Sequence, residues 1–352
     1  MPINVPLFTV NPGKTILPAL AGAVVCLFFI KTGFMAPLFL VPLGVVAFRC
    51  DYRITWFSVL LAVTGNLVIT VVTNISRGGD GSIIFWDILY FSVITSIFTL
   101  ITAPPPGFLQ RLSAGTRLLG GAFFGAILFT LVFIRSLASS GFLSYLNSLL
   151  GSFISIYRSS GADVVQNAML ESLTPQVILN LLKSIVLRGG SLVSCVILFS
   201  ICRAVSIFIA RLTARHSGAQ INETSSLSAF HVYPNVIWVL SISLFLVIAA
   251  RMAQLEVPEI ILWNLLTLCG ILYFAQGAGI LQFFLAKPTI SPFLKLLLSA
   301  LFIVFLLSPV LNVVLIGGLV LLGIAENWAP FRAPKSNGPP STPEAGNDGG
   351  AQ

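Results

Sequence analysis

The sequence predicts an all-α fold, a polytopic transmembrane helical bundle of about 8–10 membrane-spanning helices. Of its 352 residues, 57% are hydrophobic and only 9% are charged, whereas soluble domains carry roughly 25% charged residues. Apolar runs long enough to cross about 30 Å of hydrocarbon recur from Thr15 to Gly323. Helices follow, because backbone that faces lipid must pair its own polar groups. A β-barrel is excluded, since runs such as Val236–Ala250 do not alternate apolar with polar residues.

The N-terminal half is predicted to hold a segment (1–14) followed by the N-terminal transmembrane helices (15–134). The expected spans are Thr15–Ile30, Gly33–Phe48, Ile54–Val72, Ile83–Ala103 and Leu118–Ile134. The first two runs are short, and the second contains Pro37 and Pro42. We therefore expect one of these two helices to be tilted, broken or only partly inserted.

Residues 135–189 form the one extended region without a span. The segments 142–157 and 174–188 each have one apolar face, and Thr174 followed by Pro175 is typical of a helix start. Both are predicted to be interfacial helices on the membrane surface. A gating lid is the alternative.

The C-terminal transmembrane helices are predicted within residues 190–332. The expected runs are Gly190–Ala210, Pro234–Ala250, Pro258–Ala286 and Pro292–Gly323. The last run is too long for one crossing, and Pro309 followed by Asn312 suggests a break into a helical hairpin. Residues 333–352 are rich in Pro, Gly and Ser and are predicted to be a disordered tail.

The distribution of positive charge predicts the orientation in the membrane. The net charge is +8, but the Lys and Arg residues stand singly between apolar runs, so nucleic acid is not an expected partner. With ten crossings and both termini cytoplasmic, the short outer loops hold only Lys31, Arg77 and Arg251. The inner segments then hold Lys14, Arg49, Arg53, Arg111, Arg117, Arg211, Arg215, Lys287, Lys295, Arg332 and Lys335. This asymmetry favours an orientation with both termini in the cytoplasm. The protein is expected to be a multi-pass protein of the bacterial inner (cytoplasmic) membrane.

Polar residues within the spans are the candidate functional residues, because polar groups in hydrocarbon turn toward protein. We expect a small solute to contact Asn66, Arg203, Asn264, Gln276 and Gly277. Hydrogen bonding between helices is the alternative for the amides, and solvation at the interface is the alternative for Arg203. Asp87 is predicted near the outer end of its span, at a different depth from Arg203.

Motifs of enzymes are missing from the sequence: it has no HExxH, no GxSxG and no Walker loop. Its two histidines have no Cys, Asp or second His at ligand spacing, and four of its five cysteines lie inside apolar runs. The sequence therefore predicts a protein that is not an enzyme and that holds no metal or cofactor.

The C-terminal spans resemble the YybS-like family of predicted bacterial membrane proteins, a family of unknown function. The resemblance rests on PNVIWVL from Pro234, on NLLTLCGILYFAQGAGILQFFLAK, and on LLGIAENWAPFR. The residues that match the pattern of the family are Asn264, Gln276, Gly277, Leu322, Gly323, Glu326, Trp328 and Arg332. Glu326 stands where the family usually has Asp, and Pro330 replaces an acidic residue.

The N-terminal half is similar, more loosely, to the substrate-binding S components of energy-coupling-factor vitamin transporters. The likeness lies in APLFLVPLGVVAFRCDYRITW and in Ala19 and Ala23, which are four residues apart. S components use such an alanine face to contact a membrane coupling subunit. The resemblance implies coupling and ATPase subunits as partners and Ala19 and Ala23 as contact residues, in addition to the lipid bilayer.

Two functions are the main interpretations of the sequence, and a membrane enzyme that uses scattered Asp and Arg residues is a third. The first is a transport-related membrane subunit that binds a small solute between its helices. The second is a non-transporting membrane scaffold or assembly factor, for which the small-residue faces and the surface helices would be docking sites.

Overall fold

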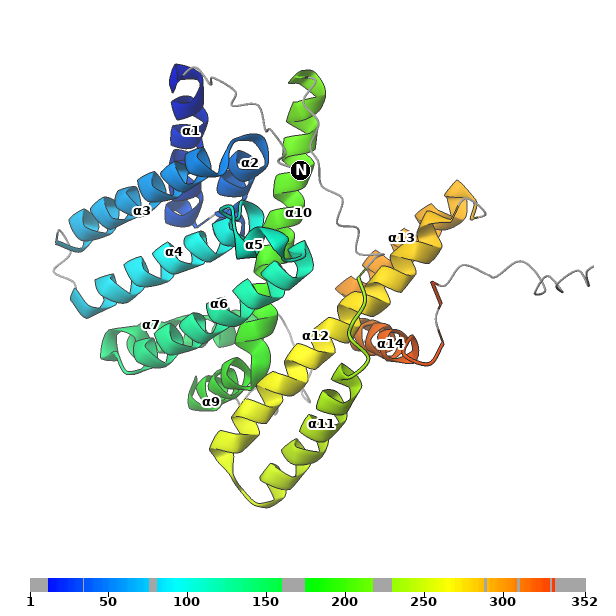
Figure 1. The fold of residues 1–352 in the computed structure, drawn as a ribbon. Coiled ribbons are helices and arrows are strands. Elements are labelled where there is room, and N and C mark those ends of the chain that lie inside the picture. Colours follow the sequence, from blue (N-terminus) through cyan, green and yellow to red (C-terminus); the bar gives the residue numbers. More distant parts are fainter. Residues whose placement is uncertain are drawn as a thin grey trace, which may run out of the picture. The chain divides into compact units, whose positions relative to one another are not determined.

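The computed structural model describes residues 12–33, 35–75, 81–159, 175–217, 230–287, 290–308, 311–329 and 331–332. Within these ranges the chain is helical and has no strand, as the sequence predicts (Figure 1). The predicted tail (333–352), the capping residue Thr174 and most of segment 1–14 lie outside the described residues. The chain forms two compact units. Unit 1 comprises 1–225 and 235–271, and unit 2 comprises 226–234 and 272–352.

Unit 1 contains the helices α1 to α11 and the first part of α12. Their bounds are α1 (Pro12–Thr32), η1 (Ala36–Leu38), α2 (Val41–Arg49), α3 (Tyr52–Ile75), α4 (Gly81–Thr102), α5 (Phe108–Arg111), α6 (Ala114–Leu137), α7 (Ser140–Ser159), α9 (Pro175–Ile185), η2 (Val186–Gly190), α10 (Ser191–Ser217), α11 (Val236–Met252) and α12 (Glu256–Ala286). Figure 1 shows α3, α4 and α6 as a row, in which each packs on the next. α10 packs against α6 and α2.

α1 and α3 run parallel, and two hydrogen bonds fix their register. Ser58 Oγ donates to the carbonyl oxygen of Ala19 over 2.8 Å. Lys31 Nζ donates to Thr70 Oγ1, also over 2.8 Å. Each bond joins residues 39 positions apart, so both helices proceed in the same direction. The chain between α1 and α3 must therefore run back across the unit in the opposite direction. This return segment is a short crossing, because its helix α2 has only 9 residues.

Two side chains of α10 donate hydrogen bonds to the backbone of this short crossing. Ser206 Oγ donates to the carbonyl oxygen of Val41 over 3.1 Å, and Cys202 Sγ donates to that of Pro37 over 3.2 Å. Gly44 allows the approach, because a Cβ there would collide with the Ser206 side chain. A hydroxyl and a thiol of α10 thus satisfy backbone carbonyls in a segment that its prolines interrupt. The second of the two short runs is thus divided into η1 and α2, which is one of the outcomes expected for this pair of runs.

The core of unit 1 lies where α2, α4, α6 and α10 meet. Phe91, Ile94 and Phe98 of α4 pack with Leu40 and with Phe199 of α10, and each of these side chains is at most 1% exposed. In contrast, large apolar side chains on the outer faces are exposed, such as those of α1 and α11. This distribution is typical of a bundle whose surroundings are hydrocarbon.

Unit 2 is built from the second part of α12, α13 (Pro292–Leu307) and α14 (Leu311–Ala325). α13 packs against α14. The long run Pro292–Gly323 is thus two helices, as the proline predicts, although Pro309 itself lies outside the described residues. α14 crosses α12 closely where Gly277 lies against the backbone of Leu319 and Gly323 lies against that of Tyr273.

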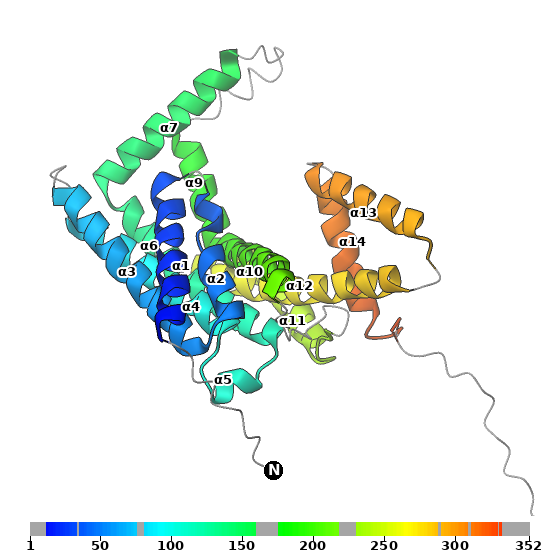
Figure 2. The same cartoon turned by 90° about the horizontal axis from the view of Figure 1, so that it is seen from above.

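Among the described residues, five helices are long and apolar enough to cross a membrane: Tyr52–Ile75, Ile84–Thr102, Ala114–Leu137, Gln176–Thr213 and Glu256–Ala286. Shorter apolar helices are Ile16–Thr32, Ala36–Arg49, Val236–Met252, Pro292–Phe302 and Leu311–Ala325. α7 and α9 form where amphipathic helices are predicted. Figure 2 shows α7 reaching away from the row of α3, α4 and α6, whereas α9 continues through η2 into α10.

Candidate functional site

A row of small polar residues runs along the buried face of α3. Thr55, Ser58, Asn66 and Thr70 are each at most 6% exposed, and together with Ala62 they follow the three- and four-residue spacing of one helix face. Near the N-terminal end of α3 the row meets α1 through Ser58. Near the C-terminal end it meets a lysine of α1 and an aspartate of α4.

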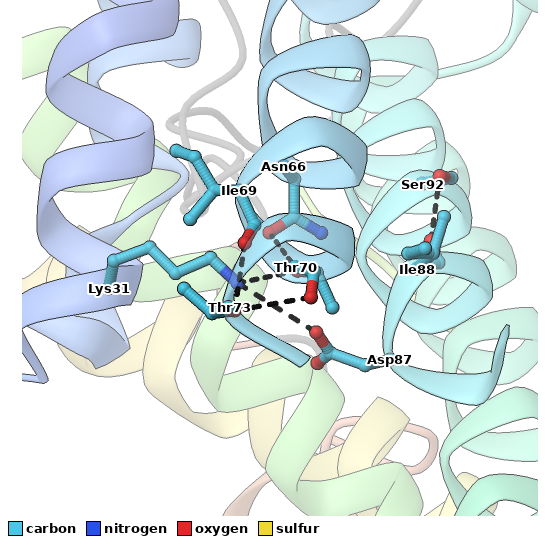
Figure 3. A network of polar contacts seen from close by, with 8 residues as sticks. All are labelled: Lys31, Asn66, Ile69, Thr70, Thr73, Asp87, Ile88 and Ser92. Atoms are coloured by element: carbon cyan, nitrogen blue, oxygen red, sulfur yellow. Dashed lines mark hydrogen bonds and ion pairs between the residues drawn. The ribbon is translucent and has the colours of Figure 1, made fainter. Parts of the chain in front are cut away.

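Four side chains at that end form a polar cluster: Lys31 of α1, Asn66 and Thr70 of α3, and Asp87 of α4 (Figure 3). Lys31 Nζ donates to Thr70 Oγ1 over 2.8 Å. The Thr70 hydroxyl in turn donates to Asn66 Oδ1 over 3.4 Å. Lys31 Nζ lies 3.9 Å from Asp87 Oδ2. The cluster therefore joins an ammonium, a hydroxyl, an amide and a carboxylate from three helices.

The charged members of the cluster are more exposed than the amide is. The Lys31 side chain is 33% exposed and that of Asp87 is 51% exposed, whereas Asn66 is only 1% exposed. Lys31 is one residue from the end of α1, and Asp87 is about two turns from the start of α4. The cluster thus leads from exposed charges near a helix end to a buried amide.

The Asn66 amide nitrogen is the unusual atom of the cluster. Nδ2 is buried and has no hydrogen-bond partner among the described residues. Figure 3 shows this nitrogen on the side of the amide that faces away from Lys31 and toward α4. A buried donor without a partner costs about 1–3 kcal/mol, and most buried polar groups in folded proteins have a partner. The amide is therefore available to an acceptor group brought by a ligand.

Arg203 of α10 contacts α2. Its guanidinium lies 5.9 Å from the centre of the Phe48 ring, a cation–π contact between α10 and α2. Phe48 lies at the end of α2 next to Arg49, and thus at the opposite end of the crossing from Lys31. Asp87, which we expect to lie at another depth than Arg203, instead pairs with Lys31.

Asn264 supports a helix break. Its Nδ2 donates to the carbonyl oxygen of Leu187 over 2.6 Å and to that of Ile260 over 2.9 Å. The chain between α9 and α10 leaves helical geometry at Arg188 and at Gly189, whose φ is 104°. This positive φ favours glycine, and Asn264 satisfies a carbonyl that the break sets free.

An ion pair lies next to the same break. Arg188 Nη2 lies 3.3 Å from Glu259 Oε1, and Trp263 Nε1 donates to the same carboxylate oxygen over 3.4 Å. The Glu259 side chain is 9% exposed. The pair was not among the residues expected from the sequence, because Arg188 lies outside the apolar runs and Glu259 lies at the very start of the run Pro258–Ala286.

Gln276 and Gly277 lie in unit 2 and hold its parts together. Gln276 Oε1 accepts from the backbone N–H of Val232 over 2.7 Å, and Nε2 donates to the carbonyl oxygen of Gly323 over 3.1 Å. Gly277 lets α14 approach α12, since a Cβ there would collide with the Leu319 carbonyl. Gln276 thus makes hydrogen bonds of the kind that the sequence left open as the alternative for such amides, and Gly277 permits the close crossing. A solute contact by either residue stays a prediction.

The C-terminal motif residues gather around this crossing. Glu326 accepts from Arg332 Nε over 2.7 Å, and Glu326 and Arg332 also form a second contact through Nη2. Both side chains are at most 5% exposed. His231 Nε2 lies 3.9 Å from Glu326 Oε1. The motif thus forms a buried ion pair in unit 2 after the end of α14. Its tryptophan, Trp328, is in contrast 72% exposed.

Ala19 and Ala23 face the interior of unit 1. They are 0% and 2% exposed, and the Ala19 carbonyl accepts from Ser58. Their shared face is therefore occupied by the chain itself in this structure, and a contact with a partner subunit stays a prediction.

Within the described part of the chain, no group of three or more His, Cys, Asp or Glu side chains is placed to hold a metal ion.

Comparison with known proteins identifies the family at a coarse level. No curated protein and no solved structure matches the chain. One family model does match, over residues 139–320, which is just over half of the 352 residues. The chain therefore belongs to the family DUF2232, described as a predicted membrane protein.

Proposed function

We propose that this multi-pass membrane protein is a transport-related subunit that binds a small polar solute at the polar cluster of Lys31, Asn66, Thr70 and Asp87. The observation that carries the proposal is the buried Asn66 Nδ2 without a partner. Binding energy comes from satisfying this donor, because the cost of leaving it unpaired is already present in the empty protein. No catalytic role is part of the proposal.

The donors of the cluster indicate the chemistry of the solute. Asn66 Nδ2 and the Lys31 ammonium both donate, so the solute carries an acceptor such as a carboxylate or a carbonyl. The Lys31–Asp87 distance of 3.9 Å is too long for a hydrogen bond, and an exposed pair of this kind contributes little stability. A solute can therefore separate the two charges at small cost.

The proposal includes partner subunits and an orientation of the protein in the membrane. The similarity of the N-terminal half to S components supports coupling and ATPase subunits as the source of energy. The excess of Lys and Arg in the predicted inner segments supports a bacterial inner-membrane location with both termini in the cytoplasm. An ATPase and a membrane coupling protein that co-purify with the full chain would support this arrangement.

The test is thermal unfolding of the detergent-purified protein with water-soluble vitamins, amino acids and small carboxylic acids. A ligand at 100 times its Kd stabilises the folded state by about 2.7 kcal/mol. We expect at least one compound to raise the Tm of the wild type and to leave that of Asn66→Leu unchanged. Leucine has a similar size and removes the amide donors.

The matched control is Ser92→Ala on α4. Among the described residues, the lost hydroxyl bonds only to the carbonyl of Ile88 in its own helix. This variant should keep the Tm shift. A panel in which no compound shifts the wild type contradicts solute binding and favours a scaffold. A shift that persists in Asn66→Leu places the ligand elsewhere.

A further inference from the structure

A groove of about 700 Å³ lies between α1, α2 and α10 in unit 1. Its apolar wall includes Pro18, Gly22, Val25 and Phe29 of α1, Val45 of α2 and Ile209 of α10. The volume lies in the range of about 300–1,000 Å³ that is usual for sites of small molecules. The groove does not include any residue of the polar cluster.

The groove lies among side chains that face the bilayer. Leu17, Val24 and Phe28, which neighbour the α1 wall, are 70%, 55% and 61% exposed. From Pro18 to Phe29 α1 rises by about 16 Å, close to half of the roughly 30 Å hydrocarbon thickness. The groove is therefore about as long as one leaflet is deep, and acyl chains are the apolar molecules that surround it.

One end of the groove carries charge. Arg49, Cys50 and Asp51 line that end, between α2 and α3. Asp51, at the start of α3, uses one carboxylate oxygen to accept from the backbone N–H of Tyr52 over 2.8 Å, and its charge lies at the same end as that of Arg49. Arg49 is exposed at the end of α2 and is free to face an anion. The groove thus joins an apolar channel to a guanidinium at the depth of the membrane surface.

We propose that this groove binds a phospholipid with an anionic headgroup. One acyl chain lies along α1 and α2, and the headgroup phosphate contacts Arg49. Guanidinium groups bind phosphate through paired hydrogen bonds, and basic pockets between membrane helices select anionic lipids. A water-soluble solute does not fit this lining, since the wall offers it no buried polar partner.

The test is native mass spectrometry of the full chain in detergent, incubated with equal amounts of phosphatidylglycerol and phosphatidylcholine. We expect the wild type to retain one phosphatidylglycerol about fivefold more often than phosphatidylcholine, the effect of about one positive charge near the membrane surface. Arg49→Gln should reduce this ratio to about one. Arg53→Gln, which changes an exposed arginine that does not line the groove, should keep it.

Filling the groove tests the position of the acyl chain. Val25→Trp should abolish retention of both lipids, whereas Val24→Trp, on the adjacent exposed position outside the groove, should not. Ala21→Leu adds bulk at an exposed lining position and is the second variant if Val25→Trp loses its helical circular dichroism. Equal retention of both lipids by the wild type overturns the proposal. The proposal is also overturned if Arg49→Gln retains phosphatidylglycerol and phosphatidylcholine in the same ratio as the wild type. Unchanged lipid retention in folded variants that fill the groove overturns it as well.

Discussion

Two asparagines of the same unit have opposite hydrogen-bonding states, and the difference bears on function. Asn264 donates to two carbonyl oxygens at a helix break, whereas Asn66 Nδ2 donates to none among the described residues. A buried amide whose donors have hydrogen-bond acceptors stabilises the fold. A buried amide with an unpaired donor destabilises the fold unless a ligand accepts that hydrogen bond. Asn66 is therefore a better candidate for binding than Asn264 or Gln276.

The two asparagines should respond differently to the same substitution. Asn264→Leu should lower the free energy of unfolding by about 1–3 kcal/mol, because it leaves the Leu187 carbonyl without its partner. Asn66→Leu should leave stability unchanged or raise it by about 1 kcal/mol, since it removes an unpaired donor and only one long hydrogen bond. Thermal unfolding in one detergent compares them. A larger loss in Asn66→Leu than in Asn264→Leu would show that Asn66 is structural.

The sequence separated these roles only in part. Asn66, Asn264 and Gln276 are all candidates by the same criterion, an amide within an apolar run. Whether such an amide finds a carbonyl depends on neighbouring helices that are distant in the chain, such as Leu187 for Asn264 or Gly323 for Gln276. Lys31 is counted as loop charge in the sequence, and its bond to Thr70, 39 residues away, has no local signal.

At the scale of the element, helix lengths could be predicted and helix partners could not. The predicted span Ile54–Val72 lies within α3, and Leu118–Ile134 lies within α6, because the length of an apolar run is a local property. In hydrocarbon, however, all apolar faces are equally solvated, and helices choose partners through small residues and shape. The parallel pairing of α1 with α3 and the short α2 between them are consequences of such packing.

The crossing of α12 and α14 depends on the lack of a side chain at Gly277. Gly277→Ala should lower the free energy of unfolding by about 1–3 kcal/mol, because its Cβ would meet the Leu319 carbonyl and overpacking has this cost. Gly270→Ala on the same helix is the control. Open space surrounds that position, so alanine should be neutral or stabilising by up to about 1 kcal/mol. Equal Tm values for the two variants would contradict the close crossing.

At the scale of the whole molecule, Cys50 reports the orientation in the membrane. The other four cysteines are at most 3% exposed, whereas Cys50 lies between α2 and α3 and is half-buried. With a cytoplasmic N-terminus and a crossing by each of α1 and α2, Cys50 lies on the cytoplasmic side. A membrane-impermeant maleimide should therefore label it in inverted vesicles and not in intact cells.

The rate of this labelling should depend on pH in a defined direction. Burial raises the pKa of the Cys50 thiol above its usual value of 9.0, and Arg49 lowers it to a smaller extent. Since the thiolate is the reactive form, the rate should keep rising beyond pH 9. Cys50→Ser should remove the label, and Lys31→Cys in that background should be labelled in intact cells. Labelling of Cys50 from outside would invert the orientation.

The contacts that hold α2 impose an order on biosynthesis. Its two side-chain anchors, Cys202 and Ser206, follow Pro37 and Val41 by 165 residues. At a synthesis rate of about 5–20 residues per second, α10 leaves the ribosome roughly 8–33 seconds after α2. During that interval the proline-interrupted crossing is without both anchors. Until α10 arrives, the earlier helices that also pack on α2, namely α1, α3 and α4, have to keep this crossing in place.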